Sequence, residues 1–189
     1  MAGLKKNHFI SNSISLNLVN TEENRRGKRY DLLENDEQVS HWLDLMFTER
    51  VILTEQFSQR NQYTHEEVSA LRELRSFLRK GFQAIADGLQ VDEQWVHTLE
   101  SYRGKAPLTF VIKENRLLPV PSGTFANALL SLIAYDALEL LVSGKLETIK
   151  RCSNPRCIWL FMDTTGKRKW CSMKICGNRM KVARHEHRA

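Results

Sequence analysis

The sequence reads RCSNPRC at residues 151–157 and WCSMKIC at residues 170–176, and these segments contain all four cysteines of the 189-residue chain. The four follow the pattern C-x4-C-x13-C-x4-C. Paired thiolates at this spacing are typical of a closed tetrahedral zinc site, with an iron site or a redox-active dithiol as the alternatives. The surrounding segment has too little apolar material to fold alone, so a metal would be required for its folding. We therefore expect one Zn2+ ion with four thiolate ligands, Cys152, Cys157, Cys171 and Cys176.

The composition is that of an ordinary globular protein, with 26% charged and 42% hydrophobic residues. No apolar run approaches the ~18 residues that cross a bilayer. Polar residues interrupt the amino-terminal segment 1–20, where a secretory signal would need an unbroken apolar core. Residues 1–151 contain no cysteine, which argues against a secreted, disulfide-bonded protein. The sequence therefore predicts a cytoplasmic protein without a membrane-spanning segment.

The net charge of +6 is unevenly distributed along the chain. Residues 151–189 contain ten lysines and arginines against two acidic residues, a net charge of +8, so residues 1–150 carry −2. A nearly neutral body with a strongly basic end is expected when that end binds a polyanion.

Hydrophobic periodicity predicts a mainly α body with one small β-hairpin. Apolar residues recur every three or four positions in five expected helices, at about 10–20, 35–46, 65–87, 92–103 and 124–142. Capping boxes are expected at Asn35–Gln38 and Thr64–Glu67. Two apolar runs separated by a charged turn, 108–112 and 117–120, predict the hairpin. The remaining segments are an expected loop at 22–31, a run at 51–57 that fits either strand or helix, and an expected link between body and tail at 145–150.

The tail has the layout of a treble-clef-like finger, in which a cysteine knuckle is followed by a hairpin and a helix. The apolar run 158–162, the turn 163–166 and the run 167–170 predict the hairpin, and the segment after Cys176 predicts the helix. The basic residues expected to contact nucleic acid on this module are Arg168, Lys169, Arg179, Lys181, Arg184 and Arg188. For Arg179 an internal bracing role is an equal alternative, and for the whole set the alternative is a solvated face that only maintains solubility.

The segment CSMKICGNRMK, residues 171–181, resembles the CGNR zinc-finger family, which is named after the residues that stand here at 176–179. The body resembles the ABATE domain in LNLVNT at 16–21, in DLL at 31–33 and in LREL at 71–74. The resemblance implies a bacterial, stress-induced transcription regulator whose finger binds Zn2+ and DNA and whose body binds a ligand. The family's paired arginines before Trp-Cys stand here as Arg168-Lys169, and lysine keeps the charge but loses the bidentate fork.

Three polar residues of the body are candidates for a small-molecule site. Asn20 and Thr21 could supply an amide and a hydroxyl, and Arg72 could bind an anionic group. The alternative is structural: Asn20 and Thr21 would end a helix and Arg72 would pair with a carboxylate. No glycine-rich phosphate loop, nucleophile elbow or paired catalytic residues is recognisable, so we predict that the protein is not an enzyme.

The sequence thus predicts two units, a helical ABATE-like domain at 1–148 and a zinc finger at 149–189. The predicted function is zinc-dependent DNA binding by a transcription regulator, with a body that senses a ligand or forms a homodimer. The alternatives are an RNA-binding module, a protein-interaction finger, and an enzyme whose site would lie in a deep polar pocket of the body. We also expect the body to keep its helices without the finger, because it has apolar residues enough for its own core.

Overall fold

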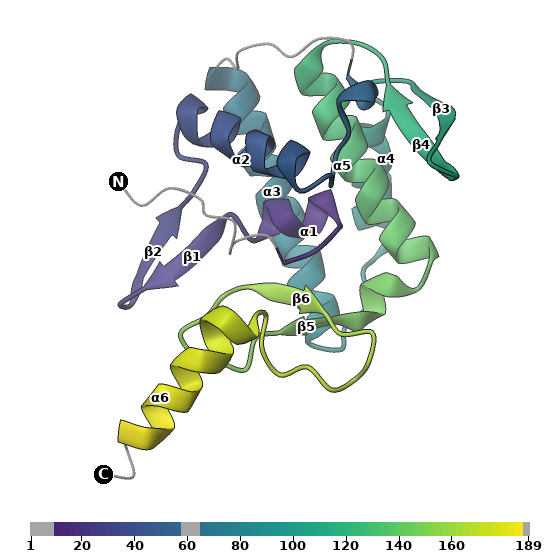
Figure 1. Cartoon of the computed structure of the whole chain (residues 1–189). Coiled ribbons are helices and arrows are strands. Elements are labelled where there is room, and N and C mark those ends of the chain that lie inside the picture. Colours follow the sequence, from purple (N-terminus) through teal and green to yellow (C-terminus); the bar gives the residue numbers. More distant parts are fainter. Residues whose placement is uncertain (1–9, 58–64, 187–189) are drawn as a thin grey trace.

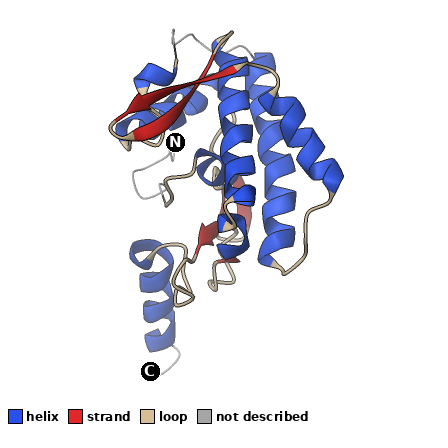
Figure 2. Ribbon diagram, turned by 90° about the vertical axis from the view of Figure 1, so that its right-hand side faces the viewer, coloured by secondary structure: helices blue, strands red, loops and turns tan. Residues whose placement is uncertain are grey.

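The computed structural model describes residues 10–57 and 65–186, and it places a helical body above a small finger (Figure 1). The short helix α1 (Ile14–Val19) lies in the middle of the body and packs against α3 (His65–Ala86) and α5 (Phe125–Val142). Helix α4 (Glu93–Arg103) packs on α5, and α2 (Asp36–Thr48) packs on α3. The last helix, α6 (Asn178–Glu186), projects away from the body in both views (Figures 1 and 2). The predicted mainly α fold with small two-stranded sheets is confirmed.

Side-chain caps begin the helices where the sequence places their starts. Asn35 accepts a hydrogen bond from the backbone N–H of Gln38, and Asp92 accepts one from that of Trp95. The Asn35–Gln38 box is only half formed, because Gln38 Oε1 accepts from the N–H of Glu34 and not from that of Asn35. The Thr64–Glu67 box lies outside the described residues at Thr64.

The stretch 22–31 is a β-hairpin, so its prediction as a loop is wrong. Strand β1 (Glu22–Arg25) pairs with β2 (Lys28–Asp31), and the register places Arg25 opposite Lys28. The two-residue turn between them has positive φ at both positions, 51° at Arg26 and 81° at Gly27. Such a turn matches the twist of the paired strands. Gly27 was the sequence signal for this turn, but the polar composition of the segment favoured the prediction of a loop.

The second hairpin agrees with its prediction. Strand β3 (Leu108–Lys113) pairs with β4 (Arg116–Pro121), and the intervening turn again has positive φ, 48° at Glu114 and 62° at Asn115. The ambiguous run 51–57 forms neither a strand nor an α-helix, but contains a single 3-10 turn, Thr54–Gln56.

The prediction that the runs 158–162 and 167–170 pair as a hairpin of the finger is wrong. Strand β6 (Leu160–Met162) pairs with β5 (Ile149–Arg151), which lies in the segment expected to be a link, and residues 167–170 form no strand. Leu146, Ile149 and Leu160 are buried in the main core of the body. The segment 145–150 is therefore a structural junction between body and finger, because its apolar residues have a core to join.

Helix α5 is apolar nearly all round because it forms the centre of the body. By length and composition it could cross a membrane, and its mean hydropathy is 1.6. More than half of it, 56%, is nevertheless buried inside the protein, and the core helix of a water-soluble domain passes the same test.

Candidate metal centre and basic surface

The four cysteine sulfurs converge on one point. The Sγ atoms of Cys152, Cys157, Cys171 and Cys176 all lie within 4.8 Å of one another. The Cys157 and Cys171 sulfurs are 3.8 Å apart, and those of Cys171 and Cys176 are 3.6 Å apart. A tetrahedron with zinc–sulfur bonds of about 2.3 Å has sulfur–sulfur edges of about 3.8 Å. A disulfide would need about 2.05 Å, so the donor set fits one tetrahedral ion and not a pair of disulfides.

Two turns, one tight and one wide, bring the cysteines together. In the first, the backbone N–H of Cys157 donates to the carbonyl of Asn154 at 2.8 Å. In the second, Cys176 lies within a wide helical turn, Met173–Gly177, which leads directly into α6. The N–H of Ser153 donates to the carbonyl of Lys169 at 2.9 Å and joins the two turns. Cys176 therefore lies in the turn that begins the basic helix, where the sequence predicts the last thiolate ligand.

Asn154 is a supporting residue that the sequence analysis missed. Its buried side chain donates from Nδ2 to the Cys176 sulfur at 3.5 Å and accepts at Oδ1 from the N–H of Arg156 at 3.0 Å. The N–H of Cys171 likewise points at the Cys152 sulfur at 3.5 Å. N–H groups directed at sulfur stabilise the thiolate form, which is the form that binds a metal. The only available signal was the position of Asn154 inside the first cysteine pair.

The thiols are close enough to share protons. Hydrogen bonds with Cys157, Cys171 and Cys176 lower the pKa of Cys152, whereas contacts with Cys152 raise the pKa of Cys157 and of Cys171. For Cys176, the contact with Cys152 acts upward, but those with Cys157 and Cys171 outweigh it and lower the pKa to about 7. Four sulfurs at this separation cannot all carry negative charge unless a cation lies among them.

Glycine at 177 is explained by close packing and not by an unusual φ. A Cβ atom there would lie 2.7 Å from Met173 Sδ and 3.3 Å from Trp170 Cδ1. Gly177 is buried as the last residue of the turn that carries Cys176. Asn178, the next residue, is exposed at the start of α6.

Arg168 lies inside the finger's own hydrogen-bond network. Its guanidinium donates to the carbonyls of Met162, at 3.0 Å, and Cys171, at 2.9 Å, and it lies 4.8 Å from the Phe161 ring centroid. Asp163 accepts from the N–H of Arg168 at 3.1 Å. Burial acts to raise the pKa of Asp163, but this bond and those from Thr165 prevail and lower it. The structure thus gives Arg168 a bracing role that the sequence did not indicate.

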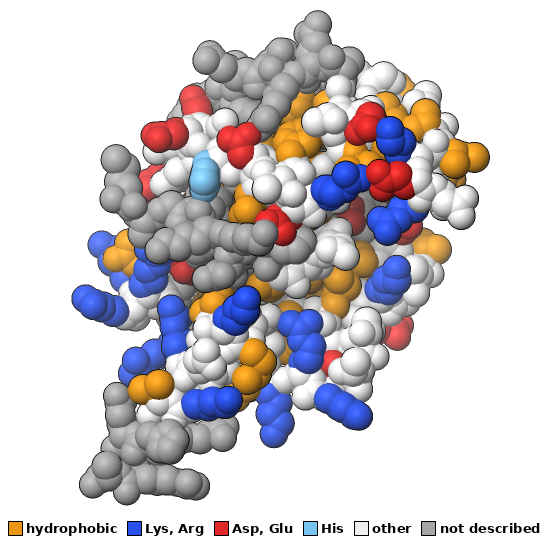
Figure 3. Space-filling view, in the orientation of Figure 1, with side chains coloured by type: hydrophobic (Ala, Val, Ile, Leu, Met, Phe, Trp, Pro, Cys, Tyr) orange, Lys and Arg blue, Asp and Glu red, His pale blue; other side chains and the backbone are white. Residues whose placement is uncertain are grey.

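The other residues predicted to contact nucleic acid are exposed where their side chains are described. Lys169, Arg179 and Lys181 are exposed, and so is Lys174, which the sequence analysis did not select. Arg184 lies on α6, and Arg188 lies outside the described residues. Figure 3 shows lysine and arginine side chains gathered over the lower part of the molecule, where the finger lies.

Polar side chains join the finger to the body. Asn20 is buried and binds the backbone of Leu160 twice, donating from Nδ2 to its carbonyl at 2.9 Å and accepting from its N–H at 3.0 Å. Trp159 Nε1 donates to the carbonyl of Glu22 at 2.8 Å. Arg151 forms a bidentate pair with Asp87 at 2.6 and 2.7 Å, which lowers the pKa of Asp87. The body therefore holds the finger through strand β6 and the knuckle.

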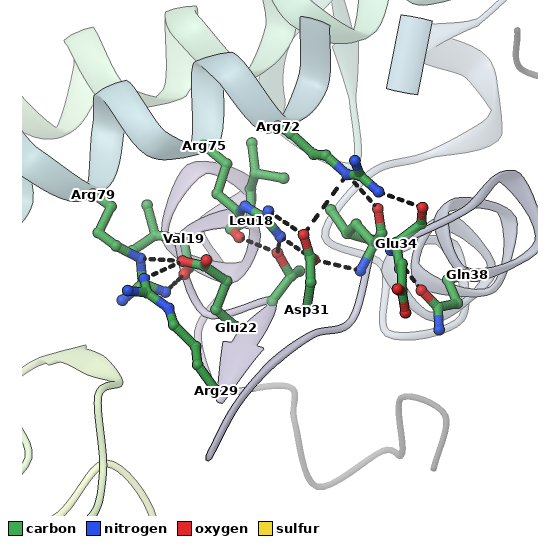
Figure 4. A network of polar contacts seen from close by, with 12 residues as sticks. Leu18, Val19, Glu22, Arg29, Asp31, Glu34, Gln38, Arg72, Arg75 and Arg79 are labelled. Atoms are coloured by element: carbon green, nitrogen blue, oxygen red, sulfur yellow. Dashed lines mark hydrogen bonds and ion pairs between the residues drawn. The ribbon is translucent and has the colours of Figure 1, made fainter. Parts of the chain in front are cut away.

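A row of arginines on α3 binds the segment that follows α1 (Figure 4). Arg75 pairs with both carboxylate oxygens of Asp31 at 2.6 Å. Arg79 donates to the carbonyls of Val19 and Ile158 and pairs with Glu22 at 2.8 Å. Burial lowers the pKa of Arg79 to about 10 against the opposing effect of Glu22. Arg72, Arg75 and Arg79 are three and then four positions apart, so they share one face of a helix. The sequence analysis did not use this signal.

The three candidate ligand-binding residues have internal partners. Asn20 binds Leu160, as described above. Thr21 donates from Oγ1 to the carbonyl of Leu18 at 2.7 Å and accepts from Arg75 at 3.0 Å. Arg72 donates to the carbonyls of Leu33, at 2.8 Å, and Glu34. The structural alternative is met in part: Asn20 and Thr21 end α1, and Arg72 Nε lies 3.7 Å from a carboxylate oxygen of Asp31, but the Asn20 side chain binds Leu160. Ligand binding by Asn20, Thr21 and Arg72 stays a prediction.

Comparison with known protein families gives two matches that together cover most of the chain. The model of the CGNR zinc finger matches residues 148–189. The ABATE model, described as "Putative stress-induced transcription regulator", matches residues 12–144. No curated protein matches the chain at a significant level. The chain belongs to the ABATE family and carries a CGNR zinc finger at its carboxyl-terminal end.

Proposed function

We propose that this protein is a transcription regulator whose finger binds one Zn2+ ion. The bound ion would fix the fold of the finger, and the finger would hold α6 against duplex DNA. The convergence of four cysteine sulfurs within 4.8 Å supports the proposal most directly. The turn that carries Cys176 continues into α6, so a metal bound there would fix the base of the basic helix. A resident zinc ion would supply no redox chemistry, and its role would be to hold this shape.

Charge and exposure support DNA as the partner. The finger region 151–189 carries a net charge of +8. Lys169, Arg179 and Lys181 extend into solvent and are available for phosphate oxygens. The sequence predicts that Lys181 and Arg184, three positions apart, share one face of the basic helix. We assign phosphate binding to this set and positioning of the finger's loop to Arg168.

Two measurements on the full chain test the proposal. Elemental analysis of the purified protein should find one zinc per chain, and a protein without zinc or another tetrahedral metal would contradict it. Duplex binding should weaken with salt, with a log–log slope of about −3.6 if four phosphates are contacted. Replacing Lys181→Ala with Arg184→Ala should flatten that slope to about −1.8.

A matched control separates phosphate contacts from net charge. The variant Lys105→Ala with Arg116→Ala removes one lysine and one arginine, both exposed, from the end of the body that carries β3 and β4 (Figure 1). Its salt slope should equal that of the unmodified protein. If both variants keep the original slope, the phosphate assignment on α6 is wrong. Tighter binding to structured RNA than to duplex DNA would favour the RNA-binding alternative.

The role of the body is the less constrained part of the proposal. Ligand sensing and homodimer formation both remain predictions, as does a cytoplasmic location. The family is one of regulators and not of enzymes, so we expect the body to modulate the finger and not to catalyse a reaction. Sedimentation of the full chain over a range of concentrations would distinguish a monomer from a dimer.

A further inference from the structure

The β1–β2 hairpin carries a dense run of cationic side chains for which no role has yet been given. Its sequence at 24–29 is NRRGKR, which places four cations in five consecutive positions around one glycine. Arg26, Lys28 and Arg29 are exposed, and so is Tyr30, at 41%. This charge lies in the body, whose net charge, with these cations included, is −2.

Two of the four cations, Arg25 and Arg29, have acidic partners on the same hairpin, whereas Arg26, in the turn, and Lys28, just after it, are available for another partner. Arg29 pairs with Glu22 at 2.7 Å, and Arg25 pairs with Glu23. Within the described part of the chain, no ion pair is formed by Arg26 or Lys28, although Lys28 Nζ lies 6.0 Å from the Tyr30 ring centroid. The hairpin thus presents two unneutralised charges at its end, where they are most accessible to a large partner.

The hairpin is also physically joined to the finger. Its first residue, Glu22, accepts from Trp159 Nε1 through its carbonyl and pairs with Arg79 through its side chain. Arg79 in turn donates to the carbonyl of Ile158, next to Trp159. Figure 1 shows the hairpin and α6 projecting from the same side of the molecule, and basic side chains in Figure 3 continue from the finger toward the hairpin. A rod-like polyanion that reaches α6 would therefore also meet the hairpin.

We propose that the β1–β2 hairpin is a second arm that contacts the phosphate backbone of the same DNA duplex as the finger. The inference rests on the proposed DNA binding and extends it to a surface of the body. A two-stranded ribbon closed by a two-residue turn is rigid enough to hold Arg26 and Lys28 at a defined position. Phosphate contacts of this kind set the orientation of a protein on the duplex without reading its sequence.

The test compares salt-dependent duplex binding by the zinc-loaded full chain and its variants. The arm variant is Arg26→Asn with Lys28→Thr, because asparagine tolerates the left-handed conformation at position 26 and threonine suits a strand. Losing two phosphate contacts should make the log–log slope shallower by about 1.8. At about 0.1 M salt this corresponds to a loss of affinity of up to about 60-fold.

Two further variants show whether charge at this place is responsible. The variant Arg26→Lys with Lys28→Arg keeps both charges and should retain the slope of the unmodified protein. The control Lys105→Ala with Arg116→Ala removes an equal number of positive charges from another part of the body. Its slope should also equal that of the unmodified protein. Unchanged circular dichroism and thermal unfolding would show that the arm variant is folded.

The outcomes separate the arm from the finger. The proposal is supported if the arm variant has a shallower slope while the charge-retaining variant and the control keep the slope of the unmodified protein. If the arm variant binds like the control while Lys181→Ala with Arg184→Ala loses affinity, the arm proposal is overturned and DNA binding by the finger stands. If the unmodified protein does not bind duplex DNA, both proposals fail. If the arm variant loses affinity for structured RNA but not for DNA, the hairpin serves a different polyanion and the proposal is overturned.

Discussion

Single polar side chains support the candidate metal centre and attach it to the body. Asn154 supports Cys176, Arg168 closes the loop between β6 and Cys171, and Asn20 binds Leu160. Asn154 and Asn20 are buried, and either would be costly to bury without a hydrogen-bond partner, by about 1–3 kcal/mol. Their pairing therefore stabilises one arrangement of the finger on the body over others.

Replacing Asn154→Ala should weaken zinc binding about 10- to 100-fold, because the Cys176 thiolate loses its side-chain donor. Competition with a colorimetric chelator would measure the change. The variant Asn178→Ala provides the control, since Asn178 is exposed at the start of α6. Equal affinities for the two variants would show that the Asn154 amide does not support the ligand.

The ion pair between Asp31 and Arg75 should make stability depend on pH. Burial acts to raise the pKa of Asp31, but the hydrogen bonds and charge of Arg75 prevail, so the folded-state pKa is lowered. A lowered carboxylate pKa contributes stability above the unfolded value of about 3.9, and that stability is lost as the pH falls through the folded value.

Asp31→Asn should therefore lower the free energy of unfolding by about 2 kcal/mol at neutral pH, with the difference closing below about pH 4. Urea denaturation at a series of pH values would measure it. Glu34→Gln, at an exposed position nearby, should give little difference at any pH. A pH-independent effect of Asp31→Asn would contradict an ionic role.

At the scale of elements, the junction of β5 and β6 decides how body and finger meet. Ile149 and Leu160 belong to the same core as α1, α3 and α5. Strand β6 is held on its other side by Asn20, the residue that ends α1. The finger is consequently attached through a strand and a helix end, and not through a flexible linker.

Asn20→Ala should cost about 2–4 kcal/mol, because it leaves a buried N–H and a buried carbonyl of Leu160 without partners. Chemical denaturation would measure the loss, and hydrogen exchange should show faster exchange at the amide of Leu160. Asn12→Ala, at an exposed position before α1, should change the stability by less than about 0.5 kcal/mol. Slow exchange at Leu160 in the Asn20 variant would contradict this attachment.

At the scale of the whole molecule, body and finger share a core, so the loss of the metal should be felt in the body. Disordering of the knuckle would withdraw support from Leu160 and from the Arg151–Asp87 pair. The expectation from the sequence, that the body is independent of the finger, remains untested. The shared core favours partial dependence.

Chelation of zinc should lower the midpoint of thermal unfolding, followed by helical circular dichroism, by about 5–10 °C while leaving most helix intact at low temperature. This corresponds to about 2–4 kcal/mol of lost support at the 2–4 °C per kcal/mol expected for a chain of this size. The variant Cys176→Ser, which lacks a ligand, should melt early and respond little to chelator. An unchanged midpoint in the unmodified protein would mean that the body does not depend on the finger.

The sequence by itself determined the features that depend on spacing and local chemistry. The cluster of four cysteines follows from their pattern, the start of α2 follows from its capping residue, the approximate starts of α4 and α5 follow from hydrophobic periodicity, and the charge asymmetry follows from counting. Each of these is a property of residues a few positions apart, so no knowledge of distant contacts is required.

Only the tertiary structure decided which distant segments meet. Strand β6 pairs with β5 and not with the segment that follows it. Arg75 and Arg79 of α3 are buried, and the Asn20 side chain binds the backbone of Leu160, 140 positions along the chain. The sequence of a strand does not specify which strand it pairs with. An arginine on an amphipathic helix can be exposed to solvent or can pair with a buried carboxylate. Burial and hydrogen-bond satisfaction across the whole fold select between these outcomes.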